Sequence, residues 1–439
     1  MKLTRQLIAG GVVSMLGMVM ASGAMAQEIQ PATETSAFVF NSILFLISGM
    51  VVMFMAAGFC MLEVGMVRSK NAATICLKNI ALYSIAGIMV WLFGYDFIYG
   101  VSEGGFLTSD FGLWKSDAQG SAIEQLAVGY AAHSDWYFQM VFVATAASIV
   151  SGTLAERIKL LPFLIFTAIL TGFIYPIQAG WQWGGGWLAA GGFSDFAGST
   201  LVHSTGGWAA LMGAIILGPR IGKYMDGKVS AMPGSNLPLA TLGTFILWLG
   251  WFGFNGGSQL AAGTAEDIIA VATIFVNTNA AAAAGVVAAM IASHFLYKKV
   301  DLTLALNGAI GGLVSITAEP LAPVIWQAVF IGAVGGVLVC LTVPLLDKLK
   351  IDDVVGAIPA HLVCGIWGTL IVPLSNADTN IVWQLIGVVS IGAFVSIVSA
   401  LIWVILKFTI GIRASEADEQ VGLDKAELGL EAYPEFRAG

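Results

Sequence analysis

Two histidines stand in matching surroundings inside long apolar stretches of this chain. His203 lies within Gly-Ser-Thr-Leu-Val-His-Ser-Thr-Gly-Gly at 198–207, and His361 lies within Gly-Ala-Ile-Pro-Ala-His-Leu-Val-Cys-Gly at 356–365. Each has a glycine five residues before it and another four residues after it. A single histidine on an apolar helix is more often a packing residue, but ionisable side chains within a membrane are costly and usually functional. The repetition therefore predicts a functional pair.

Asp195 stands at the mouth of the segment that carries His203, among glycines and aromatic residues. The run Trp-Gln-Trp-Gly-Gly-Gly-Trp at 181–187 precedes it, and Trp-Phe-Gly-Phe-Asn-Gly-Gly-Ser follows at 251–258. Any one of these tryptophans is typical of the aromatic belt at a membrane surface. A belt does not explain a phenylalanine, an asparagine and a serine on one glycine-rich helix. Glu63, close to Arg68 and Lys70, is interpreted as a structural ion-pair or capping group.

The composition places most of the chain in lipid. Of the 439 residues, 58% are hydrophobic and 10% are charged, whereas globular domains carry about 25% charged residues. No basic stripe is present, which argues against nucleic-acid binding. The four cysteines show no metal-type spacing, so we expect them to be packing residues. Neither a metal site nor a cofactor is predicted.

The first 26 residues are predicted to be a secretory signal peptide. Lys2 and Arg5 precede an apolar run at 7–20, and Ala-Met-Ala at 24–26 provides the small-residue cleavage pattern. The alternative is a first membrane span. Cleavage would leave the mature N-terminus, near Gln27, on the periplasmic side of the inner membrane.

The elements that position these residues are predicted to be helices that cross about 30 Å of hydrocarbon. Residues 27–412 form the membrane domain, and residues 413–439 form a cytoplasmic tail. Of the 19 Lys and Arg residues, only Lys115 lies on the periplasmic side once the signal peptide is set aside, as the positive-inside rule requires. The eleven predicted spans lie near residues 38–62, 79–99, 137–155, 161–180, 201–218, 237–257, 268–296, 303–318, 323–345, 355–374 and 381–409.

The two histidine segments are the fifth and the tenth of these spans. Because they are five helices apart, the second copy is inverted in the bilayer. The predicted fold is an all-α membrane protein of eleven transmembrane helices, arranged as two inverted five-helix repeats and a terminal helix. Transporters built from inverted repeats have their site near the membrane midplane, between the two halves.

Four motifs together make the sequence recognisable. The segments at 155–158 (Ala-Glu-Arg-Ile), 195–203 (Asp-Phe-Ala-Gly-Ser-Thr-Leu-Val-His), 251–258 and 361–368 (His-Leu-Val-Cys-Gly-Ile-Trp-Gly) resemble the signatures of Amt ammonium transporters in the Amt/Rh family. Nearly the whole mature chain is covered, with Ser199 in place of a common glycine. The resemblance implies an ammonium transporter rather than an enzyme. It also implies a homotrimer among membrane lipids, with methylammonium as a substrate analogue.

The resemblance assigns roles to individual residues. An outer vestibule recruits ammonium through Trp183, Ser258 and Phe142, since aromatic faces attract a partly desolvated cation by about 1–2 kcal/mol. Asp195 stabilises the cation, braces the vestibule backbone, or does both. Phe142 and Phe254 form a stacked gate below the vestibule.

Below the gate, His203 and His361 are expected to line a narrow apolar pore as a hydrogen-bonded pair. A cation that leaves water for a low dielectric loses many kcal/mol, whereas deprotonating a lysine-like ammonium at pH 7 costs roughly 4 kcal/mol. Neutral ammonia can then cross, with or without a proton relayed by the imidazoles. The absence of carbonyl or carboxylate rings from these motifs disfavours potassium conduction.

The tail resembles the cytoplasmic region through which the family couples subunits and contacts a PII-type signalling protein. Glu427-Leu-Gly429 replaces a Ser-x-His-Gly-Glu-like stretch, so control by PII stays open. Two other functions also stay open. One is an Rh-like channel for ammonia or carbon dioxide, against which Trp183 and Ser258 argue, and the other is an ammonium sensor. A metalloenzyme is disfavoured because the spans contain no carboxylate triad or HExxH pattern.

Overall fold

The structure, a computed structural model, describes residues 33–109, 111–115 and 119–435. The predicted signal peptide at 1–26 lies outside this part of the chain. Strand structure within it is confined to a hairpin of β1 (Tyr224–Met225) and β2 (Lys228–Val229). The helices before the hairpin are α2 (Glu34–Met66), η1 (Ser69–Asn71), α3 (Ala72–Met89), η2 (Val90–Gly94), α4 (Tyr95–Tyr99), α5 (Ala122–Val128), α6 (Ala132–Thr153), α7 (Leu160–Ile169), η4 (Leu170–Ile174), α8 (Tyr175–Gly180), α9 (Trp187–Gly191), η5 (Ser199–Ser204) and α10 (Thr205–Leu217). The helices after it are α11 (Leu237–Gly257), α12 (Ala265–Tyr297), α13 (Leu302–Ile316), α14 (Ile325–Lys348), η6 (Ile358–Val363), α15 (Cys364–Leu370), η7 (Val372–Leu374), α16 (Ile381–Thr409), α17 (Glu416–Val421) and α18 (Leu423–Leu428).

Each of the eleven predicted spans overlaps a helical segment of the structure. The bounds of α11 and α16 agree with the prediction, whereas the second span begins at Ala72 rather than near 79. The reason is Lys78, which the charge pattern placed in a connection. It is helical and buried, and its ammonium donates to the carbonyl of Ser151 at 2.8 Å. Eight helices of the described chain are long and apolar enough to cross a membrane, so this is a multi-pass membrane protein; the count of eleven crossings stays a prediction.

Two helices missing from those eight lie in the interior of the bundle. All residues of α6 from Phe138 to Thr153 are buried, and so are all residues of α13 from Leu304 to Ile316. A helix enclosed by other helices does not contact lipid, so it can contain small and hydroxyl residues without a penalty. The helix α6 is 22 residues long but not apolar enough to be counted among the eight, whereas α13 is apolar but has only 15 residues. These helices form the core against which the others pack.

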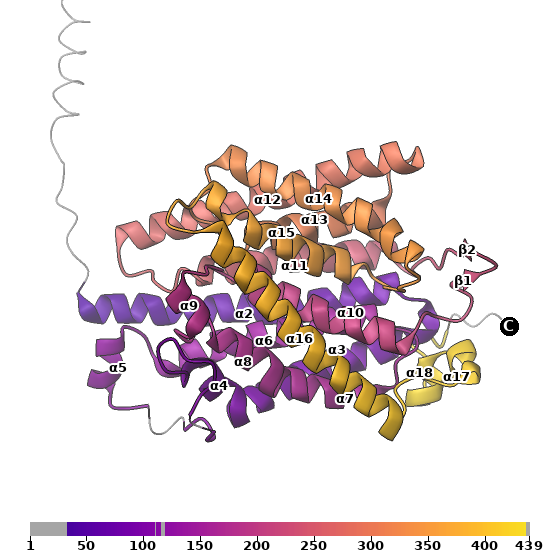
Figure 1. Cartoon of the computed structure of the whole chain (residues 1–439), viewed down its shortest axis with the longest axis horizontal. Helices are drawn as coiled ribbons and strands as arrows, with labels where there is room; N and C mark the ends of the chain where they lie inside the picture. Colours follow the sequence, from indigo (N-terminus) through magenta and orange to yellow (C-terminus); the bar gives the residue numbers. More distant parts are fainter. Residues whose placement is uncertain (1–32, 110, 116–118, 436–439) are drawn as a thin grey trace, which may run out of the picture.

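The outer helices present apolar side chains outward. Phe40 of α2 is 53% exposed, Phe295 of α12 is 71% exposed and Phe408 of α16 is 81% exposed. In contrast, both histidines of the matching segments are buried in the interior. This distribution is the reverse of that in a water-soluble protein, and lipid is the solvent that stabilises it. Figure 1 shows the long helices side by side, with α16 crossing the bundle obliquely.

Small residues allow α12, α13 and α14 to pack closely. A methyl group added to Gly285 of α12 would overlap the carbonyl oxygen of Gly308 on α13. One added to Gly336 of α14 would overlap the carbonyl oxygen of Gly285 itself. Association of helices in lipid depends on such close backbone contact because no hydrophobic driving force acts between them. These glycines therefore fix the helices next to the second histidine segment.

The bundle has two distinct ends (Figure 1). One, here called the tail end, carries the β hairpin, α17 and α18; the other, here called the α9 end, carries α4, α5 and α9. At the tail end Arg68 pairs with Glu156 at 2.5 Å, and Arg413 pairs with Glu419 at 2.7 Å. Basic residues of separate connections therefore meet at one end, as the charge asymmetry predicts.

A buried ion pair holds the tail-end connections together. Arg220 is 4% exposed and Asp352 is 1% exposed, and two guanidinium nitrogens donate to the two carboxylate oxygens at 2.8 and 2.9 Å. Burial raises the pKa of Asp352, but the hydrogen bonds from Arg220 and the charges of Arg157 and Arg220 outweigh burial and hold this pKa below its ordinary value. The pair therefore stabilises the protein above the unfolded carboxyl pKa, about 3.9, and its contribution is lost as the pH falls through the folded pKa.

We expect Asp352→Ala to destabilise the protein by about 3 kcal/mol at neutral pH, because Arg220 would stay buried with only its longer contact to Glu156, at 3.5 Å. Lys223→Ala is the matched control, since Lys223 forms a more exposed pair with Asp347 and surface pairs contribute at most about 1 kcal/mol. Thermal unfolding of the purified variants measures both effects. Equal unfolding temperatures for the two variants would contradict a stabilising role for the pair of Arg220 and Asp352.

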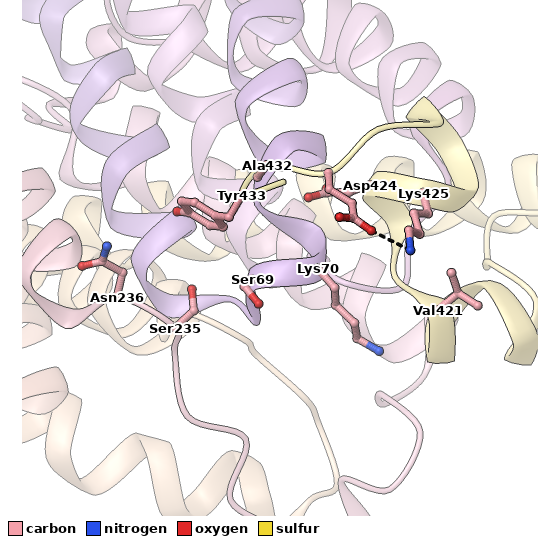
Figure 2. Close-up of a pocket in the computed structure, with 10 residues that line it drawn as sticks. Ser69, Lys70, Ser235, Asn236, Val421, Asp424, Lys425, Ala432 and Tyr433 are labelled. Carbon is pink, nitrogen blue, oxygen red and sulfur yellow. Dashed lines mark ion pairs between the residues drawn. The ribbon is translucent and has the colours of Figure 1, made fainter. Parts of the chain in front are cut away.

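The tail folds back onto the membrane helices. The carboxylate of Asp424 accepts from the backbone N–H groups of Ala73 and Thr74 at 2.9 and 2.8 Å, which caps the first turn of α3. The ammonium of Lys70 donates to the carbonyls of Glu419 and Gln420, at the end of α17. A cavity of about 540 Å³ lies between the tail and the neighbouring connections, and Figure 2 shows the residues that line it. It is lined by Ser69, Lys70, Ser235, Asn236, Val421, Asp424, Lys425, Glu431, Ala432 and Tyr433.

Candidate functional site

The two histidine helices begin in the same way and contact each other directly. The glycines five residues before the histidines, Gly198 and Gly356, have φ angles of +108° and +78°, which residues with a Cβ rarely adopt. The glycine four residues after His361 is Gly365, where a methyl group would overlap the carbonyl oxygen of Ser199. The glycines of the repeated pattern therefore have physical roles. They turn the chain into each helix and let the two helices meet.

The histidine side chains meet in the buried interior. The Nδ1 atoms of His203 and His361 are 3.2 Å apart, and the side chains are 0% and 2% exposed. One ring must donate and the other accept in such a contact, so the pair holds at most one proton between the two atoms. The Nε2 atom of His203 has no hydrogen-bond partner among the described residues. A buried polar atom without a partner is costly, so this atom is available to bind a small hydrogen-bonding molecule.

The carboxylate of Asp195 is hydrogen-bonded to backbone N–H groups rather than facing open space. Its two carboxylate oxygens accept from the N–H groups of Gly198, Ser199, Thr200 and Leu201 at 2.8–3.0 Å. These are the unpaired donors at the start of the helix that carries His203, and the side chain is 0% exposed. The geometry favours bracing over direct contact with a cation.

A stack of aromatic rings covers the histidines on the side of the α9 end. The rings of Phe142 and Phe254 are stacked with centroids 4.0 Å apart, and Phe254 lies 5.3 Å from His203. Trp183 lies edge-on to Phe142 at 6.1 Å, and its indole N–H donates to the carbonyl of Asp195 at 3.0 Å. Both phenylalanines are buried and Trp183 is half-buried. The structure thus brings together Trp183, the two phenylalanines and the histidines in one continuous column.

Ser258 ends α11 one turn beyond Phe254. Its hydroxyl donates to the carbonyl of Phe254 at 2.8 Å, so the hydrogen is used within the helix. The lone pairs of the hydroxyl oxygen remain as acceptors. The side chain is half-buried, and this orientation suits it to accept a hydrogen bond from a cation.

Two aromatic neighbours of the histidines were missed by the sequence analysis. Trp251, which the pattern made typical of a surface belt, is 0% exposed and stacks on His203 at 4.9 Å with an interplanar angle of 19°. Its indole N–H donates to the Thr317 hydroxyl at 2.8 Å. Phe59 lies 5.9 Å from His361 on the other side of the pair. Trp251 lies in the same motif as Phe254 and three residues before it, so the two side chains share a helix face. This spacing could have predicted that Trp251 lies near the histidines. No comparable signal exists for Phe59.

Glu63 also differs from its interpretation. Arg68 pairs with Glu156 instead, and the Glu63 side chain is buried, accepting from the Ser151 hydroxyl at 2.7 Å and from the Asn79 amide at 3.3 Å. The ion-pair part of the interpretation is therefore wrong. The error arises because neighbours in sequence at the end of α2 point to different sides once the helix ends at Met66.

A multi-pass helical bundle with two buried histidines in contact beneath a stack of aromatic rings fits a membrane transport protein. The family model described as the Ammonium Transporter Family matches residues 43–433. This chain belongs to that family.

Individual relatives agree with the family match. The ammonium transporter Amt2 of Archaeoglobus fulgidus is 39% identical over a gapped alignment of 458 positions, which covers 97% of this chain and 95% of that protein. The solved structure of a sensor Amt protein is 35% identical with a TM-score of 0.84, over 90% of this chain and 100% of that one. The crystal structure of Candida albicans Mep2 is 27% identical with a TM-score of 0.78, over 88% and 89% of the two chains. The fold is thus shared with Amt and Mep proteins.

Proposed function

We propose that this protein transports ammonium by binding the cation at the α9 end, removing its proton and conducting ammonia past the paired histidines. Family membership supports ammonium as the substrate. The observation that carries the mechanism is the buried Nδ1 to Nδ1 contact at 3.2 Å between His203 and His361, directly below the stacked Phe142 and Phe254.

Recruitment takes place at Trp183, Ser258 and Phe142. The indole and phenyl faces attract a cation through their quadrupoles, and the Ser258 oxygen accepts one N–H because its own hydrogen is bound to Phe254. Asp195 holds the backbone of this vestibule and the start of the next helix. A small cation with no apolar part can be selected in this way.

The stacked rings of Phe142 and Phe254 form the gate. Both are buried, and their centroid distance of 4.0 Å leaves no aqueous passage between the ring faces. A bare cation that enters this apolar region loses its hydration without a replacement. Deprotonation is the less costly route, so the cation gives up its proton above the gate and ammonia passes when the rings move.

The imidazoles then carry the neutral molecule and, where charge is transferred, its proton. The free Nε2 of His203 can bind ammonia, and the Nδ1 to Nδ1 bond provides a path along which a proton can move from one ring to the next. Two adjacent imidazoles resist a second charge. An alkali ion, which has no proton to release, gains nothing from this arrangement.

A second candidate function is ammonium sensing. It is favoured by the likeness to the sensor Amt protein, which extends over 100% of that chain at 35% identity. In a sensor the vestibule and histidines would bind ammonium without rapid flux. The Rh-like alternative has less support, because Trp183 and Ser258 lie together with Phe142 at the same end of the column.

Reconstitution into proteoliposomes tests the proposal. We expect a current or methylammonium uptake on a pulse of ammonium and none on an equal pulse of potassium. Specific ammonium binding without flux would instead favour the sensor. Equal flux of both cations would contradict the mechanism.

We expect Trp183→Leu to raise the ammonium concentration for half-maximal flux roughly tenfold, since a cation–π contact of about 1–2 kcal/mol is lost. The maximal flux should change less, because the gate and histidines are intact. Trp326→Leu is the control, since Trp326 is 64% exposed on the outer surface of α14. Unchanged half-saturation in Trp183→Leu would contradict recruitment at this site.

The same proposal includes the location of the protein and its partners. We place it in the inner membrane with the α9 end and N-terminus in the periplasm and the tail end in the cytoplasm, because the basic connections gather at the tail end. Assembly as a homotrimer and contact of the tail with a PII-type protein are parts of this proposal. The docking of Asp424 on α3 gives the tail a route to the membrane helices.

A further inference from the structure

Glu63 is a buried carboxylate on the far side of the histidine pair from the gate. Its side chain is almost completely buried, with a relative exposure of 1%. One oxygen, Oε2, accepts from the Ser151 hydroxyl and the Asn79 amide. The other, Oε1, has no hydrogen-bond partner in the described part of the chain. A buried acceptor without a partner is unusual and suggests that a hydrogen-bond donor binds there transiently.

Glu63 and His361 line the same small cavity. Phe59, Asn307 and Ser148 also line it, and its volume is about 10 Å³. A cavity of this size holds about one water-sized molecule, and ammonia is of that size. The column that begins at Trp183 therefore continues past His361 to a carboxylate with one free oxygen.

The charged groups around Glu63 do not neutralise it by direct contact. Lys78 is the neighbouring cation, but its ammonium donates to the Ser151 carbonyl at 2.8 Å and lies 4.6 Å from the centre of the Phe163 ring. No ion pair within 4.0 Å joins Glu63 to a basic side chain among residues 33–109, 111–115 and 119–435. The other titratable groups that face it are the thiols of Cys60 and Cys76 and the His361 imidazole. A buried carboxyl in this setting favours either a bound proton or a transient small cation.

We propose that Glu63 is the exit proton donor of the pathway, and that it returns the proton to ammonia at the tail end. This inference rests on the proposed function. The O–H bond of the protonated carboxyl breaks, and the nitrogen lone pair of ammonia forms the new N–H bond. Ammonium and carboxylate result, so charge is conserved. Ammonium then leaves to the water at the tail end, and the next proton relayed through the histidines protonates Glu63 again.

The test compares Glu63→Gln with the wild type in proteoliposomes. The amide can still accept from Ser151 and fills the same volume, but it holds no transferable proton. We expect ammonium-driven current to fall about 10²-fold, the usual scale of a lost general acid. The half-saturating ammonium concentration should stay within twofold, because the vestibule is unchanged. Glu63→Asp keeps the carboxyl and should restore part of the current.

Glu319→Gln is the matched control. Glu319 is also a buried carboxylate, but it binds the backbone N–H groups of Leu321 and Ala322 and the amide of Asn376, away from the cavity. We expect wild-type current from this variant. Wild-type current from Glu63→Gln overturns the inference and leaves the proposed function standing. A wild-type protein that carries no ammonium overturns both.

A second measurement covers the case in which Glu63→Gln does not fold. Infrared difference spectra of the wild-type protein after an ammonium jump should show loss of a protonated carboxyl band, and the band should shift in Glu63→Asp. A spectrum without any ammonium-dependent carboxyl band overturns the proposal. A purely structural Glu63 would give no such band.

Discussion

Exchange of both His203 and His361 for alanine is expected to abolish ammonium-driven current and leave a folded protein. The two imidazoles are the polar groups that meet within the column, with Nδ1 atoms 3.2 Å apart. Without the imidazoles this part of the column offers ammonia no hydrogen-bonding partner and offers a proton no path. We therefore expect the ammonium-driven current to fall at least about 10²-fold. The helices should persist because their contacts depend on Gly207 and Gly365 rather than on the imidazoles.

The measurement is current in proteoliposomes with circular dichroism and gel filtration of the same preparation. His294→Ala is the matched control, since this histidine is exposed near the end of α12. It should transport as the wild type does. Selective ammonium current in the double variant would contradict the role of the pair, and the alternative pathway would then have to avoid the column altogether.

Asp195→Ala is expected to give the largest loss of stability of any single substitution in the vestibule. Four backbone N–H groups would lose their shared acceptor in a fully buried position. Each unsatisfied buried group costs about 1–3 kcal/mol, so the sum is at least about 3 kcal/mol even if water replaces part of the interaction. The start of the helix that carries His203 should shift once the carboxylate is removed, and transport should be lost as well.

Thermal unfolding of the purified protein measures this effect. Asp267→Ala serves as the control because Asp267 completes the capping box of α12 through solvent-exposed hydrogen bonds with Thr264, where loss of a cap costs about 1 kcal/mol. If Asp195 instead acts by its charge on the cation, Asp195→Ala would unfold like the wild type while half-saturation rises. That result would contradict the bracing role.

The helices themselves could be predicted from the sequence because lipid imposes a local rule. A helix that faces lipid must be apolar over about 20 residues, and this signal placed α11 and α16 with correct bounds. The rule does not apply to the side of a helix that faces the protein interior. Lys78 lay outside the predicted second span for this reason, since it is buried and its charge is accommodated by the Ser151 carbonyl and the Phe163 ring rather than by water.

The sequence by itself determined the class of protein and the repeated residues. Glycine at a fixed distance from histidine indicates a local backbone conformation that other residues rarely adopt. Gly198 and Gly356 have the positive φ angles that such a spacing favours. Only the tertiary structure decided which side chains meet. Contacts such as those of Trp251 with His203, Arg220 with Asp352, and Glu63 with the cavity beside His361 join residues far apart in the chain. They depend on how helices rotate against one another, and single-residue periodicity does not contain that information.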